Sequence, residues 1–241
     1  MKLLKNYKMV LKKYHATVKK RKEIKEDTWQ VDFILDDDQK EFAYDAGQYA
    51  MIKCDKEIKD GRNNVRAFSI YSSPEEAKQD KKISIVFRLP SNSSEYKKHM
   101  VGCPIGEKIT ITGPMGKFVP DNKKELVMIA GGTGIVPFMS IIKDVLKKSS
   151  KRKITLIYTD KFEKRMIGLN TLKKLSKTNK NFTFVPRFKR VDRQYLEEHI
   201  ENKKSQFLIC GTTPMVKNVI SILQEIGIKK ENMLFEEFPG Y

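Results

Sequence analysis

Residues 126–148 join a buried strand, a glycine turn and a helix without interruption, and this unit constrains the fold more than any other stretch. Residues 126–130 (LVMIA) form an apolar run that is typical of a strand buried on both faces. Pro137 stands where the first turn of a helix accepts a residue that has no N–H. The glycine turn consists of Gly131, Gly132, Thr133 and Gly134. One face of the helix that follows is apolar and consists of Phe138, Ile141, Ile142, Val145 and Leu146.

Such a unit suits a phosphate group. Glycines let a pyrophosphate approach the backbone, and the helix N-terminus supplies free N–H donors and the positive end of a dipole. The pattern is GxGxxP, whereas the dinucleotide fingerprint is GxGxxG. Taken alone, the unit is therefore either a nucleotide site or a tight strand–helix turn that binds nothing.

Strands and helices alternate through the second half of the chain. The pattern predicts strands over residues 126–130, 153–158, 182–185 and 207–210. Helices are predicted after Pro137 and over residues 169–176, 193–200 and 214–226, and Gly227 is placed to end the last of them. This alternation predicts an α/β domain with a parallel sheet and helices on both faces.

The first half consists of short strands separated by turns. They are predicted over residues 10–20, 28–35, 47–53, 65–73, 82–87 and 107–112. Only residues 94–100 have a helical pattern, with Ser93 or Ser94 as the N-cap. Many short strands of this kind predict a small, closed antiparallel β-barrel. The polar residues 121–124 separate the halves, so the predicted domains are 1–120 and 121–241.

Composition narrows the possible functions. The chain has 241 residues and a formal net charge of +18, and its basic residues are spread along its whole length rather than gathered into one stripe. We therefore expect an acidic protein or an anionic ligand as a partner, and no nucleic acid. No apolar run approaches the ~20 residues of a membrane span, and no signal peptide is recognisable, which predicts a cytoplasmic protein.

Metal chemistry is not expected from the spacing of the ligand-type residues. The three cysteines are far apart and form no CxxC pair. The three histidines form no HExxH or other metal-binding pattern. We therefore predict neither an iron–sulfur cluster nor a zinc site.

Three further motifs are each weak evidence for a binding site when taken singly. Residues 66–74 (RAFSIYSSP) place an arginine, an aromatic ring and hydroxyls at alternate strand positions, which suits a planar anionic ligand but also an ordinary edge strand. Residues 113–118 (GPMGKF) are interpreted as a glycine–proline corner that closes the barrel. Residues 207–215 (FLICGTTPM) put Cys210 at the carboxyl end of a strand, where α/β sheets bind ligands, although a lone cysteine there is more often a small buried hydrophobic residue.

Together these motifs resemble those of the ferredoxin–NADP reductase superfamily over nearly the whole chain. RAFSIYSS is similar to the family's RxYSxxS, GPMGKF to GPxGxF, GGTGIVPF to GGTGxxPF, and CGTTPMV to CGPxxMV. The four motifs occur in the family's order and at compatible spacing. The resemblance implies a flavin-binding β-barrel followed by a Rossmann-like NAD(P)-binding domain.

The resemblance also implies roles for residues of the barrel. Arg66 would hold the flavin phosphate, Phe68 would stack on the isoalloxazine ring, and the Ser69 hydroxyl would bind near N5. Ser72 completes the same motif, and Ser93 and Ser94 match the turn that holds a second phosphate. Phe68 replaces the family's usual tyrosine, and Ser91 and Ser93 stand where relatives often have glycine. FAD is therefore expected rather than FMN.

In the second half the resemblance implies a nicotinamide site. Gly131, Gly132, Thr133, Gly134 and Pro137 would bind the pyrophosphate of the nucleotide. Cys210 and Gly211 would lie near the nicotinamide, so that Ser69 and Cys210 are the candidate catalytic residues. The terminal aromatic that covers the flavin in relatives corresponds to Phe238 or Tyr241.

The choice between NADH and NADPH stays open. Asp160 is the type of residue that accepts a hydrogen bond from a ribose 2′-OH and repels a 2′-phosphate. Several cations nearby would instead pair with that phosphate: Lys161, Arg165, Arg187, Lys189 and Arg190.

The implied function is a flavin-dependent NAD(P)H oxidoreductase that exchanges single electrons with a carrier. The net charge of +18 favours an acidic ferredoxin or flavodoxin, and a small electron acceptor is also compatible. Two alternatives remain at this point. One is an electron-transfer flavoprotein subunit of a larger redox complex, and the other is a basic binding protein that has kept the fold without its cofactor.

Overall fold

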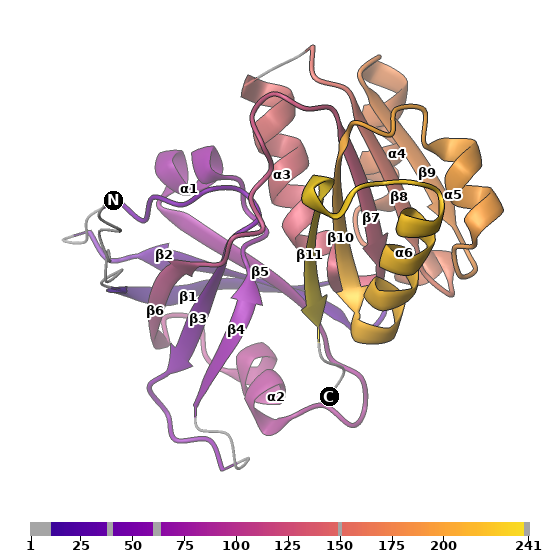
Figure 1. Cartoon of the computed structure of the whole chain (residues 1–241). Helices are drawn as coiled ribbons and strands as arrows, with labels where there is room; N and C mark the ends of the chain where they lie inside the picture. Colours follow the sequence, from indigo (N-terminus) through magenta and orange to yellow (C-terminus); the bar gives the residue numbers. More distant parts are fainter. Residues whose placement is uncertain (1–10, 38–40, 60–63, 149–150, 239–241) are drawn as a thin grey trace, which may run out of the picture.

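The short strands of the first half pair into an antiparallel barrel (Figure 1). The computed structural model describes residues 11–37, 41–59, 64–148 and 151–238. A six-stranded sheet has the order β4-β3-β6-β1-β2-β5, and a bridge between Ile70 and Ile85 joins its two edges. Its strands are β1 (Lys12–Lys25), β2 (Thr28–Leu35), β3 (Tyr49–Cys54), β4 (Val65–Ser69), β5 (Lys82–Arg88) and β6 (Lys108–Met115). Alternate side chains such as Phe33, Ile52 and Ile111 fill the interior, so the predicted barrel is confirmed.

Two helices accompany the barrel, where the sequence predicted one. Helix α2 (Glu95–Gly102) follows its N-cap Ser94, as expected. Helix α1 (Pro74–Asp80) was not expected, because Pro74 was interpreted as a strand-ending residue. Ser73 and Glu76 form a reciprocal capping box: the Ser73 N–H donates to the Glu76 carboxylate at 2.7 Å, and the Glu76 N–H donates to the Ser73 hydroxyl at 3.3 Å. The expectation of a single helix in this half was therefore wrong.

The second half forms a parallel sheet with helices on both faces, as predicted. Its five strands have the order β11-β10-β7-β8-β9. Their bounds are β7 (Leu126–Gly131), β8 (Ile154–Thr159), β9 (Phe182–Arg187), β10 (Gln206–Thr212) and β11 (Met233–Phe238). Helices α3 (Ile135–Lys148) and α4 (Leu169–Thr178) pack on one face, and α5 (Arg193–His199) and α6 (Thr213–Glu225) on the other. Strand β11 was not predicted, and it extends the sheet by pairing with β10.

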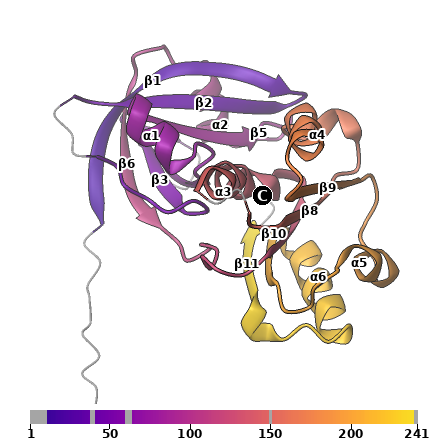
Figure 2. The same ribbon diagram turned by 90° about the horizontal axis from the view of Figure 1, so that it is seen from above.

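The barrel and the parallel sheet meet along α3, which lies between them in Figure 2. The backbone carbonyl of Ser72 accepts hydrogen bonds from the Tyr44 and Ser140 hydroxyls, both at 2.7 Å. All three residues are buried. The ammonium group of Lys143 in α3 lies 3.0 Å from the Glu76 carboxylate in α1. This polar seam fixes α3 against the barrel.

Helices that cross a membrane need a long apolar stretch, and none of the helices in the described part of the chain has the required length and apolar character.

Candidate functional site

A cleft of about 540 Å³ lies between the barrel and the carboxyl ends of the parallel strands. This volume is within the range of ligand and cofactor sites. The barrel contributes Tyr49, Met51, Phe68, Ser69, Arg88 and Lys97, and the other half contributes Thr133, Val136, Thr212, Glu236 and Phe238. Segments far apart in the sequence therefore meet at one site, with β11 next to β4 and β5 in Figure 1.

A hydrogen bond between the two halves lies within the cleft. The hydroxyl of Ser69, at the end of β4, donates to Oε1 of Glu236 in β11 at 3.3 Å. Burial raises the pKa of the Glu236 carboxyl group, while the hydrogen bond from Ser69 opposes this effect. The pair can therefore hold a proton inside the cleft more readily than an exposed glutamate would.

Glu236 is a site residue that the sequence interpretation missed. Residues 233–238 (MLFEEF) combine apolar residues with two carboxylates at the end of the chain, and they were not recognised as a strand. An edge strand in register with residues 207–212 would have placed Glu236 opposite Cys210. That register was the signal available for finding it.

Cys210 lies behind this pair rather than on the cleft surface. Its side chain is fully buried in the core between the sheet and α3. Burial raises the pKa of the Cys210 thiol, and the nearby Glu236 charge raises it further. Cys210 is therefore a neutral thiol, and its neighbour across the strand pair, Glu236, lines the cleft in its place.

Phe68 and Arg66 both belong to β4, and Phe68 lines the cleft. The Phe68 ring is buried, lines the cleft and lies 5.4 Å from the Phe87 ring, measured between centroids. The guanidinium of Arg66 lies over the Tyr96 ring at 5.1 Å. Phe68 thus offers the apolar wall expected for a planar ring system, and Arg66 a cation beside it.

Polar groups at the start of α2 fit a phosphate. The Ser94 hydroxyl caps the helix by accepting from the Lys97 N–H at 3.4 Å. The hydroxyl oxygen of Ser93 is buried and has no hydrogen-bond partner within the described residues. The Lys97 side chain lines the cleft, and burial lowers the pKa of its ammonium group. A phosphate group accepts hydrogen bonds from hydroxyl and ammonium groups of this kind, so this chain has groups that fit the diphosphate of FAD.

The glycine turn packs directly on β10. A Cβ atom on Gly134 would lie 2.2 Å from the carbonyl oxygen of Cys210, so no larger residue fits there. Thr133 and Val136 line the cleft, which places the N-terminal end of α3 at its wall. Pro137 is buried in the first turn of α3, as predicted. Among the residues predicted for the pyrophosphate, the cleft lining includes Thr133, and it does not include Gly131, Gly132, Gly134 or Pro137.

Asp160 is already engaged with the barrel. Its carboxylate forms an ion pair with Arg88, whose side chain lines the cleft, and the two side chains are 4% and 25% exposed, respectively. The Phe162 N–H also donates to Asp160, at 3.4 Å. Of the nearby cations, Arg187 pairs with Asp192 at 2.5 Å and Arg165 with Glu26 at 3.5 Å. A role for Asp160 at the ribose stays a prediction.

Among the remaining predicted residues, Ser72 and Gly211 are not part of the cleft lining. Ser72 is buried in the seam with α3, where its hydroxyl accepts from the Ser84 N–H at 3.1 Å. Gly211 packs against Met215, since a Cβ there would lie 2.8 Å from the Met215 sulfur. Phe238 lines the cleft, and Tyr241 lies outside the described residues.

Two family models match the chain in the order of the two halves. Residues 15–119 match the oxidoreductase FAD-binding domain, and residues 128–220 match the oxidoreductase NAD-binding domain.

The chain is also similar to curated sequences. It is 30% identical over 200 residues to a subunit of the Na(+)-translocating NADH-quinone reductase of Actinobacillus succinogenes, covering 73% of this chain and 49% of that protein. The corresponding subunit of Neisseria meningitidis is 32% identical over 154 residues, covering 56% of this chain and 38% of that protein. The chain thus spans about half or less of the length of these relatives.

Solved structures share the fold. The cytochrome P450 reductase GcoB of Amycolatopsis superposes with a TM-score of 0.80 at 21% identity, covering 95% of this chain and 71% of that one. A ferredoxin NADP+ reductase from Neisseria gonorrhoeae, solved with bound FAD and NADP, gives a TM-score of 0.76 at 19% identity, covering 94% and 98% of the two chains. With a matching fold, both cofactor-domain models and a cleft that fits FAD, the chain belongs to the ferredoxin–NADP reductase superfamily and is an FAD- and NAD-binding oxidoreductase.

Proposed function

We propose that this protein is the NADH-oxidising flavoprotein part of a larger redox complex and passes electrons singly to a fixed protein partner. The relatives named above are subunits of an NADH-quinone reductase, and their names support both NADH as the donor and a multi-subunit setting. The observation that carries the redox assignment is the Ser69–Glu236 hydrogen bond in a cleft between the FAD-binding barrel and the nucleotide-binding sheet. A cytoplasmic location stays a prediction.

FAD, when bound, supplies the redox chemistry, since a flavin takes up the hydride of a nicotinamide and releases the two electrons singly. The protein's own residues then bind and orient the two cofactors and exclude water from them. Phe68 and Lys97 line the cleft, where they would provide an apolar wall for the ring and a cation for a phosphate. The buried, unpartnered hydroxyl of Ser93 would supply a further donor. Thr133, at the N-terminal end of α3, is placed to hold an anionic group of the nucleotide.

The Ser69–Glu236 pair has two roles in the cleft: it orients the Ser69 hydroxyl, and it can hold a proton on the Glu236 carboxyl group. The Ser69 hydroxyl donates to Glu236, so Glu236 orients it before a ligand binds. Glu236, with its raised pKa, is able to hold a proton at its carboxyl group beside the reacting atoms. The low exposure of Ser69 keeps competing water away from this point.

The assignment is tested by the visible spectrum of the purified protein and by anaerobic mixing with NADH or NADPH. Flavin absorbance that NADH bleaches much faster than NADPH is the expected result. A protein that takes up no added FAD would overturn the proposal, and preferential bleaching by NADPH would overturn the choice of donor.

The partner is tested separately with the NADH-reduced protein. If the protein depends on a partner subunit to reach the final acceptor, it should reduce a small one-electron acceptor such as ferricyanide directly. It should reduce a short-chain quinone at least tenfold more slowly. The second candidate function, favoured by the net charge of +18, is a free-standing reductase of an acidic ferredoxin or flavodoxin. Rapid reduction of such a carrier, suppressed by salt, would favour that candidate over the subunit.

A further inference from the structure

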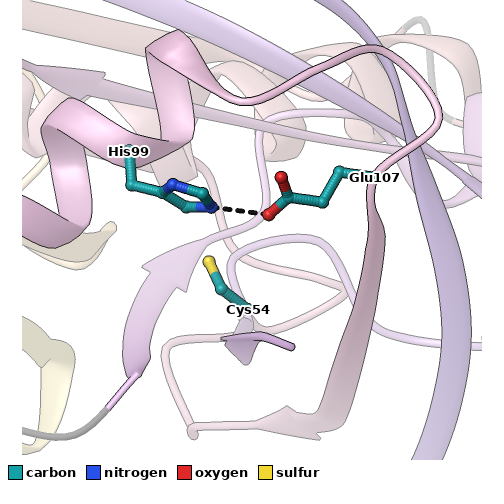
Figure 3. A group of neighbouring side chains, drawn as sticks. All are labelled: Cys54, His99 and Glu107. Carbon is teal, nitrogen blue, oxygen red and sulfur yellow. Dashed lines mark hydrogen bonds and ion pairs between the residues drawn. The ribbon is translucent and has the colours of Figure 1, made fainter. Parts of the chain in front are cut away.

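Three metal-ligand side chains meet at one end of the barrel, outside the cofactor cleft. Cys54 is the last residue of β3, His99 lies in α2, and Glu107 directly precedes β6. One sulfur, one nitrogen and one oxygen from these side chains all lie within 4.8 Å of one another. Figure 3 shows the imidazole and the carboxylate directed at each other, with the thiol beside them.

The three ligand atoms lie close enough together for one small tetrahedral ion to bind them after small side-chain movements. Bond lengths of about 2.3 Å for Zn–S and about 2.0–2.2 Å for Zn–N and Zn–O put neighbouring zinc ligands about 3.3–3.6 Å apart. His99 Nε2 and Glu107 Oε1 are now 2.5 Å apart and joined by a hydrogen bond. Small side-chain rotations that part these two atoms and bring the thiol closer would give the zinc spacing.

The chemistry of the donors favours zinc over harder cations. A thiolate, an imidazole and a carboxylate are the ligand types of zinc sites, whereas calcium and magnesium prefer oxygen alone. The deprotonated thiol and the carboxylate together carry two negative charges, which Zn²⁺ balances. Met100 places its thioether sulfur 3.3 Å from the Cys54 sulfur, so a further soft donor lies beside the group.

Burial sets this group apart from an ordinary surface ion pair. Cys54 is completely buried, and the side chains of His99 and Glu107 are each only 15% exposed. A buried site excludes competing water, and one remaining position of a tetrahedral ion is left for a water or for Met100.

The backbone around the three ligands is fixed by hydrogen bonds. The Cys54 N–H donates to the Asn64 carbonyl at 2.9 Å, and the Asn64 side chain donates back to the Cys54 carbonyl. The His99 carbonyl accepts from the Cys103 N–H at 2.7 Å, and the Glu107 N–H donates to the Pro104 carbonyl at 3.2 Å. Ligands carried on such supports need little reorganisation to bind an ion.

We propose that Cys54, His99 and Glu107 form a zinc site that clamps α2 to β3 and β6. Helix α2 carries Ser94 at its N-cap and Lys97 within its first turns, and the side chain of Lys97 lines the cofactor cleft. An ion held at His99, near the other end of the helix, would fix the position of α2. The site is thus structural, and it acts on the cleft through the helix.

The test is zinc retention by the full-length protein. The purified protein is loaded with zinc chloride, desalted and analysed for metal by mass spectrometry. One zinc per chain is expected, with an affinity at least tenfold weaker in Cys54→Ser and in His99→Gln. Cys103→Ser and His199→Gln are the matched controls, because Cys103 is also a buried thiol and His199 lies in the other domain; both should retain zinc as the wild type does.

A second measurement identifies the ligands directly. X-ray absorption at the zinc edge, which a bound flavin does not disturb, is expected to show one sulfur and two or three nitrogen or oxygen neighbours. Zinc should also raise the temperature of unfolding of the wild type but not of His99→Gln. The proposal fails if the wild type retains no zinc, which would leave only a hydrogen bond between His99 and Glu107 beside a buried thiol. Equal zinc retention by the wild type and both ligand variants would likewise overturn it, since the ion would then bind elsewhere.

Discussion

The Ser69 hydroxyl in the barrel donates a hydrogen bond of 3.3 Å to the Glu236 carboxylate in the last strand of the parallel sheet, across 167 positions of sequence. This bond connects the two halves at the place where both cofactors are expected to meet. In this bond the Ser69 hydroxyl is the donor and the Glu236 carboxylate is the acceptor.

Ser69→Ala should slow flavin reduction by NADH by about 10- to 100-fold, which corresponds to the loss of one hydrogen bond involving a charged or partly charged group. The variant keeps Phe68 and the phosphate-binding groups, so its flavin content should be unchanged. Anaerobic stopped-flow absorbance measures the rate. Ser221→Ala, at an exposed position of α6, is the control. A wild-type rate in Ser69→Ala would remove the hydroxyl from the mechanism.

Glu236→Gln should change stability in a pH-dependent way. Burial raises the pKa of the Glu236 carboxyl group in the folded protein, so its contribution favours folding at low pH and is lost as the pH rises through the folded-state pKa. The glutamine variant should therefore unfold at a higher temperature than the wild type in alkaline buffer, with the difference shrinking as the pH falls below that pKa. Thermal unfolding followed by circular dichroism measures both proteins.

The exposed residue Glu231 provides the control for this titration. Glu231→Gln should leave the pH dependence of unfolding as it is in the wild type. An identical pH dependence for Glu236→Gln and the wild type would mean that the carboxyl group of Glu236 titrates normally.

Features set by neighbouring residues were predictable from the sequence. The glycine turn and Pro137 form one continuous unit, and the Ser94 cap lies directly before its helix. Alternating apolar residues determine the barrel strands for the same reason, because a period of two places one face in the core. Helix α1 was missed although its capping box is local, since Pro74 was interpreted only as a strand breaker.

Features set by pairing between distant segments were not predictable. Glu236 becomes a site residue only because β11 pairs with β10 and faces β4. The ion pair that engages Asp160 comes from Arg88, 72 residues earlier in the chain. Cys54, His99 and Glu107 form no metal-binding spacing in the sequence, and only the folding of the barrel brings their side chains together.

Gly134→Ala should destabilise the protein by about 1–3 kcal/mol or more, as overpacking does in a close-packed interior. The added methyl group would lie 2.2 Å from the Cys210 carbonyl oxygen, so the turn and β10 must move apart. Urea unfolding measures the loss. Gly102→Ala is the matched control, because a Cβ there meets no atom within 4 Å and the position is helical. Equal stability of the two variants would show that the turn is not packed against β10.

Arg88 and Asp160 should be energetically coupled across the two halves of the protein. The pair joins β5 to the end of β8, and the Asp160 side chain is only 4% exposed. In a double-mutant cycle, Arg88→Gln and Asp160→Asn should each reduce the free energy of unfolding, and together they should cost less than the sum, with a coupling of about 0.5–3 kcal/mol. The pair Lys229 and Glu231, both exposed and 3.9 Å apart, should give a coupling near zero. Additive effects of Arg88→Gln and Asp160→Asn would mean that the ion pair does not hold the halves together, and would leave Asp160 free to contact a nucleotide.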